Sequence, residues 1–349
     1  MDDAKAEVVC NHTDAWEWVY TMQPVYMSIV CLLGVLGNSF VLCVFCLQRR
    51  CGSVADIYLS NLAAADLLMV LCLPFWVVTI VHHFHWRFGE HMCQLINTIT
   101  GMNYLCSVLF LTLVSVDRYL ALTRPLSQQR GRRTLWTHGI CCGIWIVGLL
   151  FSFPALLFRT VKFYPDLGVD VCYMAYPHEG WRLRYNMTAN IVGFLVPVPV
   201  VSFCTYHISK ALRSSQKIRK NCRSCVERKA AFLVLVILTV FVICWLPYQI
   251  LIFLDTLDYY EITSGCTWAH VLDIGTQLAT YLGYSNSSIN PYLYVIVGKQ
   301  FQQKMSEVFI LILCRNKWQQ RKSNQAKVNY STTKKSEPMK NVTQSTDAE

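Results

Sequence analysis

The chain has 349 residues, of which 54% are hydrophobic and only 15% are charged. So few charged residues are a poor match for the surface of a soluble globular protein. The formal net charge of +10 gives no support to nucleic-acid binding, because the basic residues gather beside apolar runs on one side of a predicted membrane.

Seven apolar runs follow one another along the chain, each about as long as the roughly 20 residues that cross a hydrocarbon core. Because backbone groups in lipid must bond to each other, each run is predicted to be a helix. Buried helices of a soluble protein are the alternative, but too little chain remains to cover them. The runs are 25–47, 57–81, 94–122, 139–158, 187–208, 230–254 and 268–297.

Lys and Arg are unevenly divided between the two sides of this membrane. The segments after the first, third and fifth runs hold two, four and eight, and the chain from Gly298 onward holds ten, whereas the other side holds six. The positive-inside rule places the N-terminus outside and the C-terminus in the cytoplasm, as expected for a multi-pass protein of the plasma membrane. The first run is expected to act as its own signal anchor.

The sequence therefore predicts an all-α membrane protein: an extracellular N-terminus over 1–24 and a seven-transmembrane helix bundle over 25–297. An amphipathic pattern predicts a short eighth helix over 298–314 at the inner leaflet. Cys314 is a candidate palmitoylation site, with an ordinary reduced thiol as the alternative. The polar remainder, 315–349, is predicted to be a disordered cytoplasmic tail with candidate phosphorylation sites.

The outer side differs from the inner side in acidic residues and in cysteine chemistry. Thirteen of the 21 acidic residues fall there, which predicts a negative face that attracts cations, or else a generic solvated surface. Four cysteines fall in this oxidising space. Pairing of Cys93 with Cys172 leaves Cys10 for Cys266, although other pairings stay open. Asn11 begins a glycosylation signal in the same compartment.

Asp66 is the only carboxylate deep within an apolar run. A charge at the bilayer centre costs about 3 kcal/mol on insertion scales, so such a residue is a candidate functional site. A carboxylate among hydroxyl and amide oxygens predicts a hydrated pocket for a sodium-sized cation, with a hydrogen-bonded helix contact as the alternative. Polar residues at similar depth in other runs are Asn38, Asn103, Ser107, Asn286, Ser287 and Asn290.

Charged residues also meet at the predicted cytoplasmic ends of the third and sixth runs. Asp117 and Arg118 are adjacent there, and Glu227 is placed to pair with Arg118 across the helix interface; solvated edge charges are the alternative. Five runs are interrupted by proline, which kinks a helix and provides a hinge. These prolines are Pro74, Pro154, Pro197, Pro247 and Pro291.

Seven features occur together and in order: Gly37-Asn38, "LAAAD", "DRY", Trp145, Pro197, "CWLP" and "NPYLY". This combination resembles the rhodopsin-like (class A) G-protein-coupled receptors and covers all seven runs. The stretches "LLFRTVKFY", "ICWLPYQILIFLDTL" and "LATYLGYSNSSINPYLYVIVGKQF" resemble more closely the bradykinin (kinin) receptors within that class.

This resemblance implies a receptor for bradykinin-like peptides, which carry an arginine at each end. It implies signalling through Gq-class G proteins to phospholipase C and calcium, with receptor kinases and arrestin acting at the tail. Asp255 and Asp273 match residues that receive the N-terminal arginine of the peptide, and Arg159 matches a residue suited to its carboxylate. The other implied pocket residues are Gln249, Gln277, Tyr284 and Trp245, the last as a rotamer switch.

The resemblance also implies a sodium site and an activation switch. The sodium site comprises Asp66, Asn103, Ser107, Asn286 and Ser287. The switch comprises Asp117, Arg118, Tyr119, Glu227, Trp245, Pro247, Asn290, Pro291 and Tyr294, with Arg118 meeting the G protein after its release from Glu227. The chain departs from the family pattern at Thr205, where many members have a tyrosine. It also has Gly101 where the kinin subtype that prefers des-Arg peptides carries lysine.

Other functions fit the sequence less well. An angiotensin-like or chemokine-like receptor is the alternative within the class, and a transporter is the alternative outside it. No inverted repeat is apparent, and Asp66 has no second carboxylate to form a relay. A light receptor needs a lysine for retinal, which the seventh run lacks. No nucleophile motif with a matching base is present, so an enzyme is not expected.

Overall fold

The computed structural model describes residues 14–48, 53–123, 130–165, 168–215, 222–260, 262, 265–299 and 301–310. The chain divides into two compact units, Met1–Gln302 and Gln303–Glu349. The architecture below is that of the first unit.

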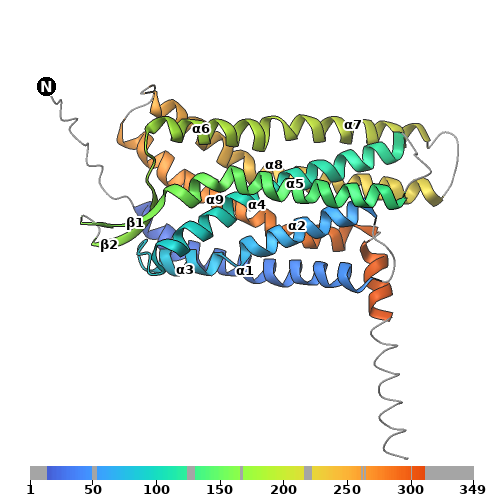
Figure 1. The fold of residues 1–349 in the computed structure, drawn as a ribbon, viewed down its shortest axis with the longest axis horizontal. Helices are drawn as coiled ribbons and strands as arrows, with labels where there is room; N and C mark the ends of the chain where they lie inside the picture. The colour runs from blue at the N-terminus through green and yellow to red at the C-terminus, as the bar shows by residue number, and fades with distance from the viewer. Residues whose placement is uncertain are drawn as a thin grey trace, which may run out of the picture. The chain divides into compact units, whose positions relative to one another are not determined.

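Long helices run alongside one another in this unit (Figure 1). The second predicted run is divided between α2 and α3, and the fifth is divided among α6, the π-helix η1 and α7. All seven predicted runs are therefore helical, which confirms the predicted helix bundle. The helices are α1 (Asp14–Leu47), α2 (Val54–Val70), α3 (Leu73–Val81), α4 (Gly89–Thr123), α5 (Arg130–Phe158), α6 (Glu179–Asn190), η1 (Ile191–Leu195), α7 (Pro197–Ser215), α8 (Cys222–Tyr259) and α9 (Cys266–Val297).

Six stretches within the described ranges are long and apolar enough to cross a membrane, and α9 is not among them. Polar side chains interrupt α9 between Ser285 and Asn290. These polar groups are buried, and α9 packs against α8, α1 and α2. Because neighbouring helices surround the polar segment, α9 has no need of an apolar surface there.

The predicted proline positions fall into two groups. Pro154, Pro247 and Pro291 lie inside continuous helices. Pro74 lies in the first turn of α3, and Pro197 is the first residue of α7, directly after η1. Proline is tolerated in a first turn because the amide hydrogen that it lacks would have no partner there. The second and fifth runs therefore contain a local irregularity beside a proline, although each still forms one stretch long enough to cross a membrane.

A β-hairpin between α5 and α6 lies at one end of the bundle (Figure 1). It pairs β1 (Arg159–Tyr164) with β2 (Val169–Met174) in antiparallel register. The predicted Cys93–Cys172 disulfide is confirmed and ties β2 to the start of α4. Cys266 is also disulfide-bonded, while Cys10 lies outside the described residues, so that pairing stays a prediction.

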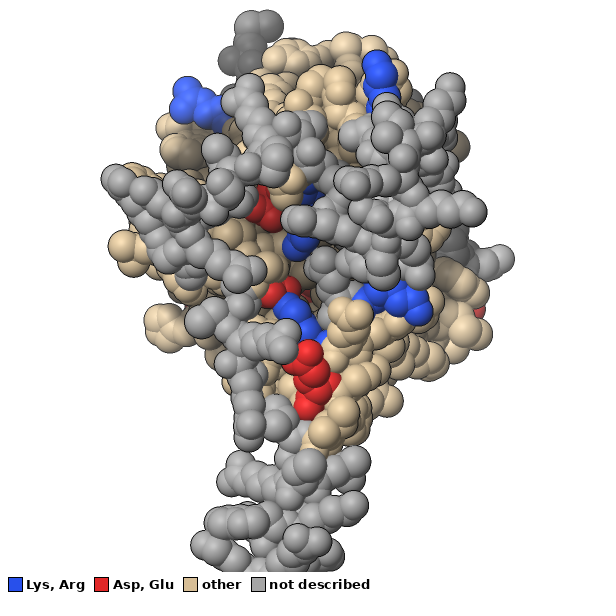
Figure 2. All heavy atoms as spheres, turned by 90° about the vertical axis from the view of Figure 1, so that its right-hand side faces the viewer, with Lys and Arg blue, Asp and Glu red and all other residues tan. Residues whose placement is uncertain are grey.

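Both Lys or Arg and Asp or Glu groups are visible at the opposite end of the unit (Figure 2). Many of the basic residues behind the predicted orientation, including Arg49, Arg50 and Lys217, lie outside the described residues, as do Asn11 and Cys314. Within the predicted eighth helix, residues 301–310 are helical. Phe301 anchors the start of this segment by ring contacts with Phe40, Phe45 and Tyr294.

Candidate functional site

Asp66 is completely buried and is bound by side chains from two other helices. From α4, Asn103 Nδ2 and Ser107 Oγ donate to Asp66 Oδ1 at 3.0 and 3.1 Å. From α9, Asn290 Nδ2 donates to Asp66 Oδ2 at 2.9 Å. A buried carboxylate must be hydrogen-bonded to be tolerated, so this cluster fixes α2, α4 and α9 relative to one another.

The other predicted members of this cluster contact it less directly. Ser287 Oγ donates to Asn103 Oδ1 at 3.4 Å, and Asn38 Nδ2 donates to the Ser287 carbonyl at 2.9 Å. Asn286 is buried, and its Nδ2 has no partner among the described residues. Asn290 Oδ1 is likewise buried without a partner in the described chain. The carboxylate, two hydroxyls and this spare amide oxygen are hard oxygen ligands, which fit a small hard cation.

Trp245 packs against Tyr104, a residue that the sequence analysis did not identify. The rings of Trp245 and Tyr104 are 4.6 Å apart. Tyr104 Oη accepts a hydrogen bond from Gln249 Nε2 at 2.7 Å and donates to the Ala189 carbonyl at 3.2 Å. Trp245, Gln249 and Tyr104 are all buried. These contacts join α4 and α8 to α6 directly beside the predicted rotamer switch.

Two glycines make room for this aromatic pair. A Cβ at Gly283 of α9 would meet the Trp245 ring at 2.9 Å. A Cβ at Gly193, within η1, would overlap the Tyr104 ring and hydroxyl. Real Cβ contacts do not approach so closely, because interiors are packed to near-crystalline density. The small residue in the π-helical turn therefore permits the position of Tyr104.

Arg159 follows α5 directly and begins β1, and it is set among tyrosines. Its Nε is buried and has no hydrogen-bond partner in the described chain. Burial lowers the pKa of the guanidinium from its usual range, but arginine stays charged in proteins. No ion pair with a carboxylate forms among the described residues. The tyrosines within electrostatic reach are Tyr185, Tyr176, Tyr284 and Tyr248.

Tyr176 illustrates what these phenols offer. Burial raises the pKa of Tyr176 to about 12, so its hydroxyl stays protonated near neutral pH. Tyr284 is buried and packs in a cluster with residues of α1, α2 and α3. Gln277 accepts a hydrogen bond from the Tyr281 hydroxyl at 2.8 Å. Arg159 and Tyr284 thus lie together, whereas Gln277 is engaged by its own helix.

Asp255 and Asp273 line one cavity of about 290 Å³, together with Arg182 and Asp258. Asp255 is already paired: Arg182 Nε donates to Asp255 Oδ2 at 3.1 Å, and the terminal guanidinium nitrogen contacts Oδ1. Asn186 Nδ2 also donates to Oδ2, at 2.7 Å. Asp258 and Asp273 accept no hydrogen bond from the described residues. The two predicted carboxylates therefore share a cavity but differ in their availability.

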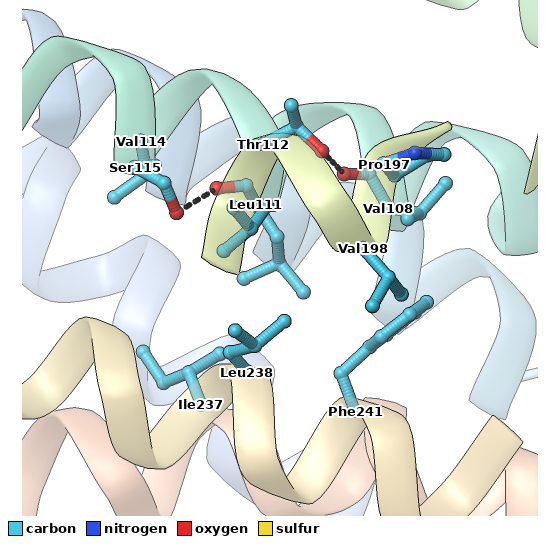
Figure 3. A pocket seen from close by; sticks show the side chains of 11 residues that line it. Val108, Leu111, Thr112, Val114, Ser115, Pro197, Val198, Ile237, Leu238 and Phe241 are labelled. Carbon is cyan, nitrogen blue, oxygen red and sulfur yellow. Dashed lines mark hydrogen bonds between the residues drawn. The ribbon is translucent and has the colours of Figure 1, made fainter. Parts of the chain in front are cut away.

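An apolar seam joins α4, α7 and α8 (Figure 3). Its cavity of about 20 Å³ is lined by Val108, Pro197 and Phe241 among others. The two hydroxyls that line it are engaged, because Thr112 and Ser115 donate to carbonyls of their own helix at 2.7 and 2.9 Å. The seam is therefore too small and too apolar for a peptide, and any movement of α8 must repack it.

The inner-end residues are only partly described. Asp117 is buried, Arg118 is half-buried, and Tyr119 packs against Phe203 and His207 with ring centroids 5.9 Å apart in each case. The Glu227 side chain lies outside the described residues, so its pairing with Arg118 stays a prediction. Tyr294 is buried on α9.

The chain has Thr205 where many family members have a tyrosine, and the structure shows that Tyr206 does not take its place. Thr205 faces the interior, with only 6% of its surface exposed, whereas the neighbouring Tyr206 is 63% exposed. A helix turns by about 100° per residue, so the tyrosine points away from the bundle and does not replace the missing one.

The sequence matches a family model described as 7 transmembrane receptor (rhodopsin family) over residues 37–294. The chain belongs to the rhodopsin family of seven-transmembrane receptors. Curated relatives place this receptor in the bradykinin receptor branch, whose members are receptors and not enzymes.

Three relatives illustrate the similarity. The B2 bradykinin receptor of Sus scrofa is 46% identical over 88% of this chain and 83% of its own length. The B2 bradykinin receptor of Rattus norvegicus is 45% identical over 89% and 78%. The B1 bradykinin receptor of Homo sapiens is 38% identical over 86% and 85%.

Sequence reasoning missed several residues that build this receptor's site. Tyr104 and Gly193 belong to no recognisable sequence motif. Their contact depends on a π-helical turn, which the sequence pattern did not predict. Asn186 begins the tripeptide Asn186-Met187-Thr188, which matches a glycosylation signal, but its side chain is buried and bound to Asp255. Arg182 was counted only as one of the six outer basic residues. A signal for Arg182 did exist, because Arg182 and Asn186 are four apart and share a helix face.

Substitution of Gly193 by alanine is expected to destabilise the receptor by about 1–3 kcal/mol, as overpacking does in well-filled cores. The new Cβ displaces Tyr104 and breaks its hydrogen bond with Gln249. Thermal unfolding of the purified receptor measures the effect. Gly180→Ala is the matched control, because no atom lies within 4 Å of its Cβ position. Equal shifts in the two variants would contradict this account of Gly193.

Proposed function

We propose that this receptor binds kinin-like peptides at its extracellular end and signals through Gq-class G proteins to phospholipase C and calcium. The ligand assignment depends chiefly on one observation. The half-buried Arg159 has a buried Nε without a hydrogen-bond partner and no carboxylate partner in the described chain, while a separate cavity gathers three carboxylates. A peptide with a cationic N-terminus and a free C-terminal carboxylate complements both.

Arg159 is proposed to bind the C-terminal carboxylate of the peptide. A buried charge without a partner is costly, and a ligand carboxylate offsets that cost by forming a charge-assisted, bidentate pair. Protonated tyrosine hydroxyls such as that of Tyr176 add hydrogen-bond donors. The position of Gly101 supports this location: a Cβ there would meet Ser152 at 2.9 Å and Tyr185 at 4.0 Å. The glycine thus leaves space beside one of the Arg159 tyrosines.

The acidic cavity is proposed to bind the cationic N-terminus of the peptide. Asp255, Asp258 and Asp273 reach it from the outer ends of α8 and α9. Like charges gathered around one cavity raise the local concentration of cationic ligands. The relatives are named as bradykinin receptors, and the resemblance of the sequence implies peptides with an arginine at each end. The N-terminal arginine is proposed to enter this cavity.

The signal is proposed to pass inward through the aromatic pair beneath the ligand. A ligand shifts a conformational equilibrium only if it binds one state better than the other. Contact with Gln249 would disturb Tyr104 and therefore Trp245, since the three side chains form one buried group. Movement of α8 would then repack the apolar seam and expose Arg118 to the G protein. Pro247 and Pro291 provide the hinges.

A sodium ion is proposed to stabilise the resting arrangement. Asp66, Ser107 and Asn290 would hold it, with Asn103, Ser287 and Asn286 around them, and the ion would supply positive charge to the buried carboxylate. At the other end of the chain, receptor kinases and arrestin are proposed to act on the tail, 315–349, which lies outside the described residues. The N-terminus is proposed to be extracellular.

Cells that express this chain are expected to show a calcium rise with bradykinin or its des-Arg form. The response is expected to disappear when Gq-class proteins are blocked, because calcium release then has no input. Surface expression is measured in parallel by an N-terminal epitope on intact cells, which also tests the proposed orientation. A normally expressed receptor that answers neither peptide would contradict the kinin assignment.

Replacement of Arg159 by glutamine is expected to weaken a peptide with a free C-terminal carboxylate by about 10–100-fold, as for a lost hydrogen bond to a charged group. The same peptide with a C-terminal amide is expected to lose little, because it has no charge to pair. Competition binding on membranes measures both. Lys162→Gln, an exposed basic residue on the same strand, is the control. An equal loss for both peptides would refute the pairing.

Exchange of sodium for a larger organic cation at constant ionic strength is expected to raise agonist affinity a few-fold. The ion and the agonist favour different states, so each lowers the affinity of the other. Asp66→Asn removes the carboxylate while keeping the side-chain size, and is expected to abolish this sodium dependence. Competition binding in the two salts measures it. An unchanged sodium effect in Asp66→Asn would place the ion elsewhere.

A further inference from the structure

The outer carboxylate expected to receive the ligand already holds an arginine of its own chain. Arg182 of α6 meets Asp255 of α8 through two guanidinium nitrogens, and Asn186 adds a third donor at 2.7 Å. An ionised carboxylate has about four acceptor sites, so three are filled. A ligand guanidinium needs both oxygens for a bidentate pair, and it obtains them only after Arg182 leaves.

This pair is accessible enough to exchange. The side chains of Arg182 and Asp255 are 41% and 26% exposed, and both line the cavity of about 290 Å³. An exposed ion pair contributes only about 0–1 kcal/mol, so a ligand can displace it. A deeply buried pair would instead act as a permanent clamp. The exposure of the pair therefore favours an arginine that a ligand can displace over a permanent contact between α6 and α8.

The cavity charge is set by the same contact. With Arg182 in place, one of three carboxylates is neutralised, and Asp258 and Asp273 stay without an ion pair in the described chain. An N-terminal arginine carries two positive charges, on its guanidinium and its α-ammonium group. Two charges match the two remaining carboxylates. Removal of Arg182 would leave a third carboxylate for the same ligand group.

We propose that Arg182 is a specificity-determining residue: an internal competitor of the ligand's N-terminal basic residue for Asp255. This inference rests on the proposed peptide function and deepens it. Arg182 lowers the affinity for cationic N-termini and sets how strongly a peptide that begins with arginine is preferred over one that lacks this residue.

The test compares Arg182→Gln with wild type, using two probes. L-argininamide carries both positive charges of an N-terminal arginine and no carboxylate, and its binding to the purified receptor in nanodiscs is followed by thermal shift. Bradykinin and a form lacking its first arginine are compared by competition binding. Arg182→Gln is expected to bind argininamide and bradykinin about fivefold more tightly at low salt, the scale of one exposed ion pair, and the truncated peptide unchanged.

Three controls separate competition from a structural role. Arg184→Gln removes the same charge from the same helix, but Arg184 lies over the Trp181 ring and is expected to change nothing. The double variant Arg182→Gln/Asp255→Asn is expected to lose the gain, because the freed carboxylate is gone. Higher salt is expected to reduce the gain by screening.

The outcomes distinguish this inference from the proposed function. A gain for argininamide in a receptor that ignores kinin peptides would refute the peptide function and support the competitor. Kinin binding with no change in Arg182→Gln, an equal gain in Arg184→Gln, or a loss for every probe would overturn the competitor role. A loss for every probe, with a lower unfolding temperature, would make the pair a structural clasp.

Discussion

The buried carboxylate of Asp66 is the contact on which much of this bundle depends. Charge at this depth is tolerated only when it is hydrogen-bonded, and three donors from α4 and α9 meet it. The polar interruption of α9 follows from the same requirement, because Asn290 must reach the carboxylate. The composition of α9 is too polar for it to be identified as a membrane-spanning helix. It is nevertheless stabilised by one buried residue of α2, Asp66.

The aromatic layer above this cluster has a different basis. Trp245 and Tyr104 touch one another, and glycines on two other helices make room for them. At near-crystalline packing density, small displacements are passed on rather than absorbed. The hydrogen bond between Gln249 and Tyr104 therefore makes Gln249 part of the same packed group as Trp245. The apolar seam next to Phe241 continues the same packed path toward the inner ends.

The end of the bundle that carries the β-hairpin combines rigid and exchangeable parts. The Cys93–Cys172 disulfide ties the β-hairpin to α4. In contrast, α6 and α8 are joined by the Arg182–Asp255 pair, whose side chains are partly exposed to solvent. Covalent bonds and paired strands hold a fixed shape, whereas exposed ion pairs exchange readily.

The sequence alone determined the class of this protein. Seven apolar runs, the basic bias of the segments predicted to face the cytoplasm, and the order of the motifs from Gly37 to Tyr294 follow from the bilayer and from local chain chemistry. Each of these signals lies in consecutive residues. Asp66 and its amide and hydroxyl partners were predictable for the same reason, since few polar residues occur at that depth.

Only the tertiary structure decided which of those residues meet. Asn290, predicted both for the polar pocket around Asp66 and for the activation switch, binds Asp66, whereas the amide nitrogen of Asn286 does not contact it. Asp255 was expected to be open to a ligand and is paired with Arg182. Tyr104 and Gly193 carried no motif, and a π-helical turn brings them together. Such contacts join residues far apart in the chain, and a single turn of helical phase decides whether they form.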